Sequence, residues 1–246
     1  MPKHPAAHFL FYGDPGSGKS TAAASLPRPM IVFAFDPRGK DAPYHKRGNH
    51  IEEHESEHCP YVEIRDDKER LIRIEYYHDP QPESPTAWSR FRSRLLDVSD
   101  VAWRTIVFDS CTFMELSARK YDEYVENRGA RDKRQHYGAS KEGIEEVCLM
   151  RVAGYRCNVV TIAHVDEAKD ELHGTFIRSP AFPGKLSKRA GAAYGEMYRF
   201  YVDVDNDGSR EYRVQTLSDR GYNAATQIGA PDRCAPTYQS FWSGTA

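Results

Sequence analysis

A glycine-rich segment near the N-terminus carries the residues with the clearest chemistry. Residues 13–20, GDPGSGKS, match the phosphate-binding pattern G-x-x-x-x-G-K-[ST] at every fixed position. Glycines let the backbone turn so that its N–H groups face phosphate oxygens, and the lysine reaches the β- and γ-phosphates. The segment predicts a site for a purine nucleoside triphosphate, formed by Gly13, Asp14, Pro15, Gly16, Ser17, Gly18, Lys19, Ser20 and Thr21.

The flanking sequence supports this prediction. An apolar strand is expected over residues 9–12 and a helix over residues 21–26, so that the helix N-terminus adds to the anion site. A glycine-rich turn that matches the pattern by chance is the alternative, and it explains neither flank. The Ser20 hydroxyl is expected to ligate Mg²⁺.

Two further buried strands end in polar residues. Residues 105–108, TIVF, run into Asp109, which we expect to hold Mg²⁺ together with Ser20. Residues 158–163 run into His164, which we expect to face the γ-phosphate and sense it. The alternatives are a helix-capping role for Asp109 and a solvent-exposed strand end for His164.

The remaining pattern predicts an α/β fold. Residues 30–35 form another continuous apolar run, as in strands buried on both faces of a parallel sheet. Hairpins are expected over residues 61–77 and 196–217, and a polar loop over residues 166–183. Helices are expected over residues 84–96, 111–126, 140–155 and 186–193. Residues 1–246 are interpreted as one domain, with an insertion at about 40–85 and an extended tail at about 218–246.

Composition limits the classes of function. A net charge of −2 gives no global case for a nucleic-acid-binding protein, so any polyanion site must be local. Five cysteines without paired spacing indicate free thiols in a reducing cytoplasm. We expect neither a signal peptide nor a bilayer-spanning segment, and therefore no membrane partner.

Several motifs in a fixed order resemble a known family. GDPGSGKST, FAFDPRGK, TIVFDS, HYG, NVVTIAHVDE and PAFPGKLSKRAG, spread over residues 8–220, resemble phage RecA-like, AAA-type P-loop proteins, including the Sak-type single-strand annealing ATPases. The resemblance implies a RecA-like core with a mainly parallel central sheet, helices on both faces and the β-hairpin insertion. It also implies ATP and Mg²⁺ as cofactors, single-stranded DNA as a partner, a homo-oligomer and a phage recombination or single-strand-binding protein partner.

The chain departs from the RecA-like pattern at the residues that activate water. Arg38 stands where many RecA-like proteins have a glutamate after the second strand, and Ser110 follows Asp109 where many AAA proteins have one. Asp36 is then the candidate base. Slow hydrolysis, or ATP as a conformational ligand, is the corresponding expectation.

Two basic segments are candidates for contacts outside the phosphate site. The first contains possible DNA contacts at Arg128, Arg131, Lys133 and Arg134, with His136 and Tyr137 available for base stacking. The second contains candidate cations that would reach the γ-phosphate of a neighbouring subunit, namely Lys185, Lys188 and Arg189. Solvated surface charge is the alternative for both.

A histidine repeat gives a weaker candidate. His50, His54 and His58 recur every four residues next to Cys59, a spacing that holds Zn²⁺ when it lies on a helix. Interleaved glutamates favour a solvated segment instead. The leading prediction is an ATPase that handles single-stranded DNA; the alternatives are a small-molecule or nucleotide kinase and a non-catalytic, ATP-gated assembly module.

Overall fold

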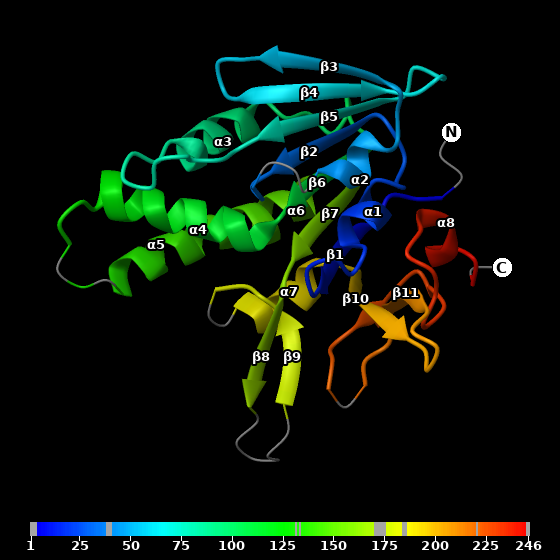
Figure 1. The fold of residues 1–246 in the computed structure, drawn as a ribbon. Coiled ribbons are helices and arrows are strands. Elements are labelled where there is room, and N and C mark those ends of the chain that lie inside the picture. Colours follow the sequence, from blue (N-terminus) through cyan, green and yellow to red (C-terminus); the bar gives the residue numbers. More distant parts are fainter. Residues whose placement is uncertain are drawn as a thin grey trace.

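Six parallel strands form the centre of a ten-stranded sheet, in the order β10-β1-β7-β6-β2-β5 (Figure 1). The computed structural model describes residues 4–37, 41–130, 132, 134–169, 176–183, 186–219 and 221–244. The six strands are β1 (His8–Gly13), β2 (Met30–Ala34), β5 (Leu71–Tyr76), β6 (Thr105–Asp109), β7 (Asn158–Ala163) and β10 (Glu196–Val204). Every residue of β2, β6 and β7 is buried, as their continuous apolar sequences predict.

Strand β7 lies between β1, which leads into the phosphate loop, and β6, which ends at Asp109. This order confirms the predicted RecA-like core. It also brings the carboxyl ends of β1, β7, β6 and β2 to one edge of the sheet, where ligands of open α/β folds collect.

Antiparallel strands complete both sides of the sheet. The predicted first hairpin is confirmed as β4 (Pro60–Arg65) and β5, and the second as β10 and β11 (Arg210–Gln215). Because β5 also pairs in parallel with β2, the first hairpin extends the central sheet. The sheet ends at β3 (His50–Glu55), beside β4, and on the other side at β11, with the short β12 (Ala225–Thr226) also pairing with β10.

The histidine repeat therefore starts on a strand and not on a helix. His50 and His54 lie on β3, whereas His58 lies in the turn before β4. Among the described residues, no group of three His, Cys, Asp or Glu side chains is placed to hold a metal ion.

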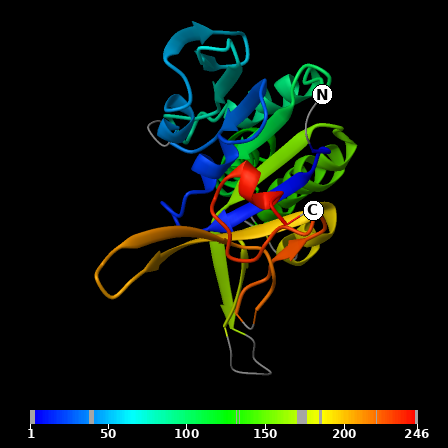
Figure 2. The same ribbon diagram turned by 90° about the vertical axis from the view of Figure 1, so that its right-hand side faces the viewer.

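Helices cover both faces of the sheet, as predicted (Figure 2). One face carries α3 (Ala87–Leu96), α4 (Cys111–Tyr121), α5 (Arg134–Glu145), α6 (Val152–Gly154) and α7 (Leu186–Ala193), with π-helical turns η1 (Asp122–Glu126) and η2 (Glu146–Arg151). The other face carries α1 (Lys19–Ala23), α2 (Ala42–His45) and α8 (Tyr238–Phe241). Trp88, Phe91 and Leu95 of α3 are buried, but Leu96 is 70% exposed because it lies about 100° further round the helix.

The polar loop expected over residues 166–183 is instead a hairpin. Strands β8 (Val165–Lys169) and β9 (Phe176–Pro180) pair in antiparallel fashion as a separate two-stranded sheet that projects from the body (Figure 1). The loop prediction was wrong because these strands are exposed on both sides and lack an apolar alternation.

The five cysteines are all free thiols, as expected. None of the described helices combines the length and the apolar composition needed to cross a membrane.

Candidate nucleotide-binding site

The phosphate loop is shaped by close backbone contacts that only glycine permits. A Cβ atom on Gly13 would lie 2.2 Å from the carbonyl oxygen of Phe200 on the neighbouring strand β10. Gly18 has a φ of 95°, a left-handed conformation that disfavours other side chains. The fixed glycines of the motif therefore set the turn that leads from β1 into α1.

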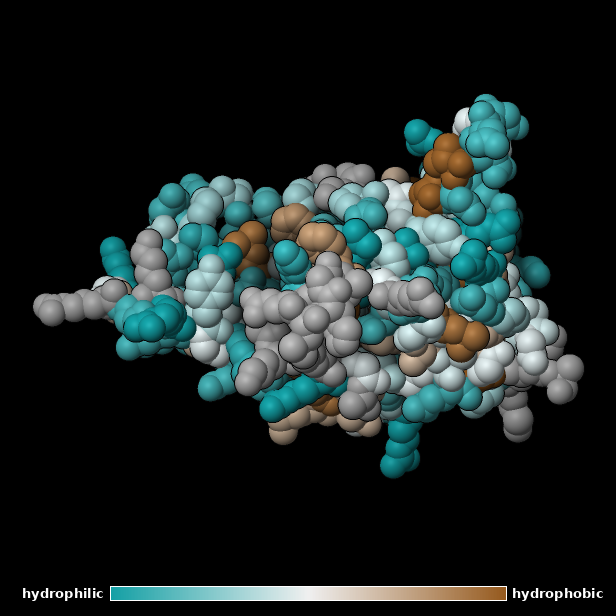
Figure 3. Space-filling view, turned by 90° about the horizontal axis from the view of Figure 1, so that it is seen from below, coloured by the Kyte–Doolittle hydropathy of each residue, from teal (hydrophilic) through white to brown (hydrophobic). Residues whose placement is uncertain are grey.

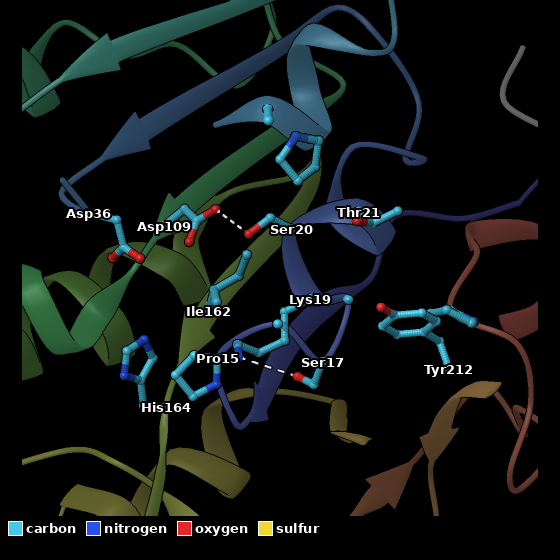
Figure 4. A pocket seen from close by; sticks show the side chains of 15 residues that line it. Pro15, Ser17, Lys19, Ser20, Thr21, Asp36, Asp109, Ile162, His164 and Tyr212 are labelled. Atoms are coloured by element: carbon cyan, nitrogen blue, oxygen red, sulfur yellow. Dashed lines mark hydrogen bonds between the residues drawn. The ribbon is translucent and has the colours of Figure 1, made fainter. Parts of the chain in front are cut away.

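Lys19 lies folded back onto this turn. Its Nζ atom donates hydrogen bonds to the carbonyl oxygens of Gly13, at 2.8 Å, and Asp14, at 2.7 Å. The Ser17 Oγ atom lies 3.4 Å away (Figure 4). Lys19 is only 7% exposed, so its ammonium group is held at the floor of the site.

Ser20 and Asp109 meet as the sequence predicts. The Ser20 Oγ atom donates to Asp109 Oδ2 at 2.8 Å, across 89 residues of sequence (Figure 4). A hydroxyl and a carboxylate supply the oxygen ligands that Mg²⁺ prefers. These two side chains are therefore the ones that would hold the ion.

The electrostatics of Asp109 also fit a bound cation. Burial, followed by the negative charge of Asp36, raises the pKa of Asp109 to about 6. Hydrogen bonds from Ser20 and Tyr44 and the charge of Lys19 oppose this rise. A divalent ion beside Asp109 would stabilise its charged form, because opposite charge lowers a carboxyl pKa.

Tyr44 of α2 was not predicted as a site residue. Its hydroxyl donates to Asp109 Oδ2 at 2.9 Å, and its side chain is 1% exposed. Burial and the neighbouring Asp109 raise the pKa of Tyr44 well above its ordinary value, so it remains a protonated donor. No periodicity in the polar segment around it indicates this contact.

Asp36 lies beside Asp109 because β2 and β6 are neighbours. The backbone N–H of Phe35 donates to the Asp109 carbonyl oxygen at 2.7 Å. Ser110 occupies the position after Asp109 at which many AAA proteins have a glutamate. Its hydroxyl donates a hydrogen bond to Asp36 Oδ1 at 2.5 Å. This contact gives the candidate base a fixed orientation.

His164 follows β7 and links two other elements. Its backbone N–H donates to Thr112 Oγ1 at 3.1 Å, and its ring packs edge-on against Phe113, both on α4. Its carbonyl oxygen accepts a 2.8 Å hydrogen bond from Ala181, just after β9. The residue therefore lies where α4 and both ends of the β8–β9 hairpin meet.

One cavity of about 500 Å³ is lined by Lys19, Ser20, Asp36, Asp109 and His164 together. Asp36, Asp109 and His164 lie toward one end of it, and Tyr212 lies toward the other, with Lys19 between them (Figure 4). Tyr212 was also missed by the sequence analysis, because its place depends on the pairing of β11 with β10.

The residues predicted to act outside this cavity lie elsewhere. Arg128 and Arg134 are exposed near the α4–α5 connection, and Arg134 forms a 2.8 Å ion pair with Asp132. His136 is unsuited to base stacking, since it is 6% exposed and its Nδ1 atom lies 2.5 Å from Asp122. Tyr137 is 55% exposed.

The predicted cations that would act on a neighbour are only partly described. Arg189 on α7 is exposed and lies 3.8 Å from Glu145 of α5. Arg131, Lys133 and Lys185, and the side chain of Lys188, lie outside the described part of the structure.

Comparison with protein families places this site in a known group. A family model described as "AAA domain" matches residues 6–207, which is most of the chain. The match includes all of the described cavity-lining residues except Tyr212 and Pro236. The chain belongs to the AAA domain family. It is thus a P-loop, nucleotide-binding, ATPase-like domain, as the phosphate loop and Asp109 indicate. No curated protein matches the sequence.

Solved structures similar to this AAA domain include a secretion-system ATPase and a flagellar accessory protein. One is a prototypical ATPase from the type III secretion system of pathogenic bacteria, 12% identical, with a TM-score of 0.45, covering 80% of this chain and 52% of that one. The other is the flagellar accessory protein FlaH from Methanocaldococcus jannaschii, 8% identical, with a TM-score of 0.42, covering 91% and 83%. This AAA domain spans about half the length of the secretion ATPase chain.

Proposed function

We propose that this AAA domain binds ATP with Mg²⁺ and hydrolyses it. The observation that carries the proposal is the convergence of Lys19, Ser20, Asp109 and His164 on one cavity from three separate places in the sequence. Lys19 and the Ser20–Asp109 pair supply the lysine and the oxygen ligands that phosphoryl transfer from a nucleotide requires.

Each side chain has a role that follows from its position. Lys19 exchanges its bonds to the Gly13 and Asp14 carbonyl oxygens for phosphate oxygens. Ser20 and Asp109 would hold Mg²⁺, whose positive charge would offset that of the phosphates. Asp36, oriented by Ser110, accepts a proton from the attacking water, and His164 contacts the γ-phosphate.

The cavity supports a second proposal, that catalysis involves a homo-oligomer. Among the described residues that line it, Lys19 is the single lysine or arginine. Charge on a transferring phosphoryl group is usually met by a further cation. We propose that Arg189, Lys185 or Lys188 of a neighbouring copy supplies it.

The finer proposal is that the ATPase acts on single-stranded DNA in phage recombination or annealing, with a recombination or single-strand-binding protein as partner. The motif resemblance supports it, together with the β8–β9 hairpin, which starts directly after His164 and exposes Phe176 and Ile177. An exposed aromatic ring such as that of Phe176 can stack on unpaired bases. The face on which this hairpin lies is mostly hydrophilic, with small separate hydrophobic groups (Figure 3).

ATP turnover measured with and without a single-stranded oligonucleotide tests both levels of the proposal. We expect Mg²⁺-dependent phosphate release that DNA accelerates and that Lys19→Ala abolishes. ATP binding without turnover would instead indicate an ATP-gated assembly module, and phosphate appearing on an acceptor would indicate a kinase.

A gel shift over a salt series tests the DNA contact separately. We expect binding that weakens as salt rises, because phosphate contacts release counterions. Arg128→Ala and Tyr137→Ala should each weaken the shift, and no shift at low salt contradicts the DNA proposal.

A further inference from the structure

One end of the nucleotide cavity has no role in the phosphate chemistry. The lining of this cavity includes Thr21, Tyr212 and Pro236 in addition to the catalytic residues. In Figure 4, Tyr212 and Thr21 lie on the opposite side of Lys19 from Asp36 and His164. A triphosphate whose γ-phosphate lies at Asp109 and His164 therefore extends its nucleoside toward Tyr212.

The fold holds the Tyr212 ring against the phosphate loop. Tyr212 pairs with Val202 in the β10–β11 hairpin, and β10 pairs with β1, the strand that enters the loop. A Cβ atom on Gly18 would lie 3.3 Å from Tyr212 Cδ1, so the ring edge lies directly over that glycine. The side chain is nevertheless 45% exposed.

Pro236 is brought to the same place by a second backbone contact. Val214 and Cys234 form an antiparallel bridge, in which the Val214 N–H donates to the Cys234 carbonyl oxygen at 2.8 Å. Tyr212 lies two residues before Val214 and Pro236 two residues after Cys234, so the bridge brings the two segments together. Both residues line the cavity.

We propose that Tyr212 and Pro236 hold the purine base of the nucleotide by stacking, and that the site accepts both ATP and GTP. The inference rests on the proposed nucleotide binding at Lys19. An aromatic ring offers stacking energy to any base, because every base has a π-face.

The lack of base-edge recognition follows from the side chains present. Among the described side chains at this end, only those of Thr21 and Tyr212 carry a hydrogen-bonding group, in each case a hydroxyl. Strong discrimination between adenine and guanine requires polar groups that the wrong base leaves unpaired. Amide, carboxylate and guanidinium side chains are missing from the described lining at this end, so stacking is the main side-chain contribution to base affinity.

Calorimetric titration of the full chain with three ligands tests this proposal. The ligands are the non-hydrolysable imido analogues of ATP and GTP and inorganic tripolyphosphate, each with Mg²⁺. Tyr212→Ala should weaken both nucleotides by about 5- to 100-fold, the range expected for loss of one base–aromatic stack, and leave tripolyphosphate unchanged. In the wild type, the two nucleotides should bind within about tenfold of each other.

Three further variants separate stacking from other effects. Tyr212→Phe should retain nucleotide affinity within about threefold, since it keeps the ring. Tyr212→Leu, which keeps bulk over Gly18, should behave like Tyr212→Ala. Val204→Ala, an exposed change on the same hairpin, should alter nothing.

Specific outcomes overturn the proposal. Unchanged nucleotide affinity in Tyr212→Ala, or an equal loss of tripolyphosphate affinity, shows that Tyr212 does not bind the base. A preference for ATP over GTP above about 50-fold shows that the base edge is read. Failure of the underlying nucleotide site is distinguishable, because then tripolyphosphate binding in the wild type is absent or insensitive to Lys19→Ala.

Discussion

Two β-hairpins leave the sheet at opposite ends of the nucleotide cavity, and they are attached differently. The β10–β11 hairpin continues the central sheet, because β10 pairs in parallel with β1 from Phe9 to Gly13. The β8–β9 hairpin is a separate sheet that is joined to the body next to His164. A hairpin within a continuous sheet opens less readily than one held at its base. The Tyr212 end is thus suited to fixed binding and the His164 end to response.

The side chain of Tyr222 contacts both hairpins. The Arg178 guanidinium, from β9, lies 5.2 Å from the Tyr222 ring centroid, and that of Arg199, from β10, lies 3.2 Å from it. The Arg178 backbone N–H also donates to the Gly221 carbonyl oxygen at 2.9 Å. The hairpins are therefore linked through the segment 221–223, and the following variants test how far their roles differ.

Lys19→Ala should affect both ends of the cavity and have the largest effect. Loss of charge-assisted bonds to phosphate should weaken ATP binding by at least about 100-fold. Calorimetric titration measures this, with Lys68→Ala in the exposed β4–β5 turn as the matched control. Unchanged ATP affinity in Lys19→Ala would show that ATP does not bind at Lys19, and the two ends of the cavity could not then be assigned to its γ-phosphate and its base.

Asp109, at the His164 end of the cavity, should make the stability of the folded protein depend on pH. Without metal, the folded protein retains the Asp109 proton to a higher pH than the unfolded chain, since folding raises this pKa to about 6. The free energy of unfolding should therefore fall by up to about 3 kcal/mol as pH rises from about 4 to 6. Urea unfolding in a chelator measures the fall, which Asp109→Asn should reduce; an unchanged profile in that variant contradicts the assignment.

His164→Ala should separate the two ends by kinetics. We expect turnover to fall by about 10- to 100-fold while ATP affinity changes by less than about threefold, the reverse of the pattern for Tyr212→Ala. His164→Gln, which keeps a polar group, should recover part of the rate. Steady-state kinetics and titration together measure the split, and a matched loss of affinity would show that His164 binds ATP in its ground state.

Arg178→Ala should have the smallest effect, confined to the β8–β9 hairpin. It removes a 2.6 Å ion pair with Glu167 and the contact with Tyr222. Global stability should change by less than about 1 kcal/mol, while amide exchange in β8 and β9 speeds up by about fivefold. Arg213→Ala, which removes a 2.6 Å pair with Glu211 in β11, is the control and should leave β8 and β9 unaffected. If amide exchange were equally slow in both hairpins of the wild-type protein, the β8–β9 hairpin would not be the more loosely attached of the two.

The central strands and the phosphate site were predictable because their signals are local. Buried parallel strands are continuous apolar runs, and the bounds of β7 match the prediction. The bounds of helix α7 match the prediction as well. Lys19 and Ser20 belong to one motif, and Asp109 and His164 each end such a run. Strand ends meet at one edge of a parallel sheet, so the side chains meet as well.

The rest of the site depends on contacts between distant segments. Tyr44 reaches Asp109 across 65 residues from a segment without periodicity. Tyr212 enters the cavity only because β10 pairs with β1. Strands β3, β8 and β9 are mostly exposed and lack an apolar alternation, so their pairing partners, and not their own sequence pattern, determine that they are strands.

The position of Lys19 has a consequence for the heat of nucleotide binding. Its ammonium group is already buried and bonded to the Gly13 and Asp14 carbonyl oxygens. Association therefore exchanges one set of strong hydrogen bonds for another, with little water to remove from the lysine. The measured enthalpy will understate the strength of the lysine–phosphate contact, while the entropy will benefit from a side chain that was ordered beforehand.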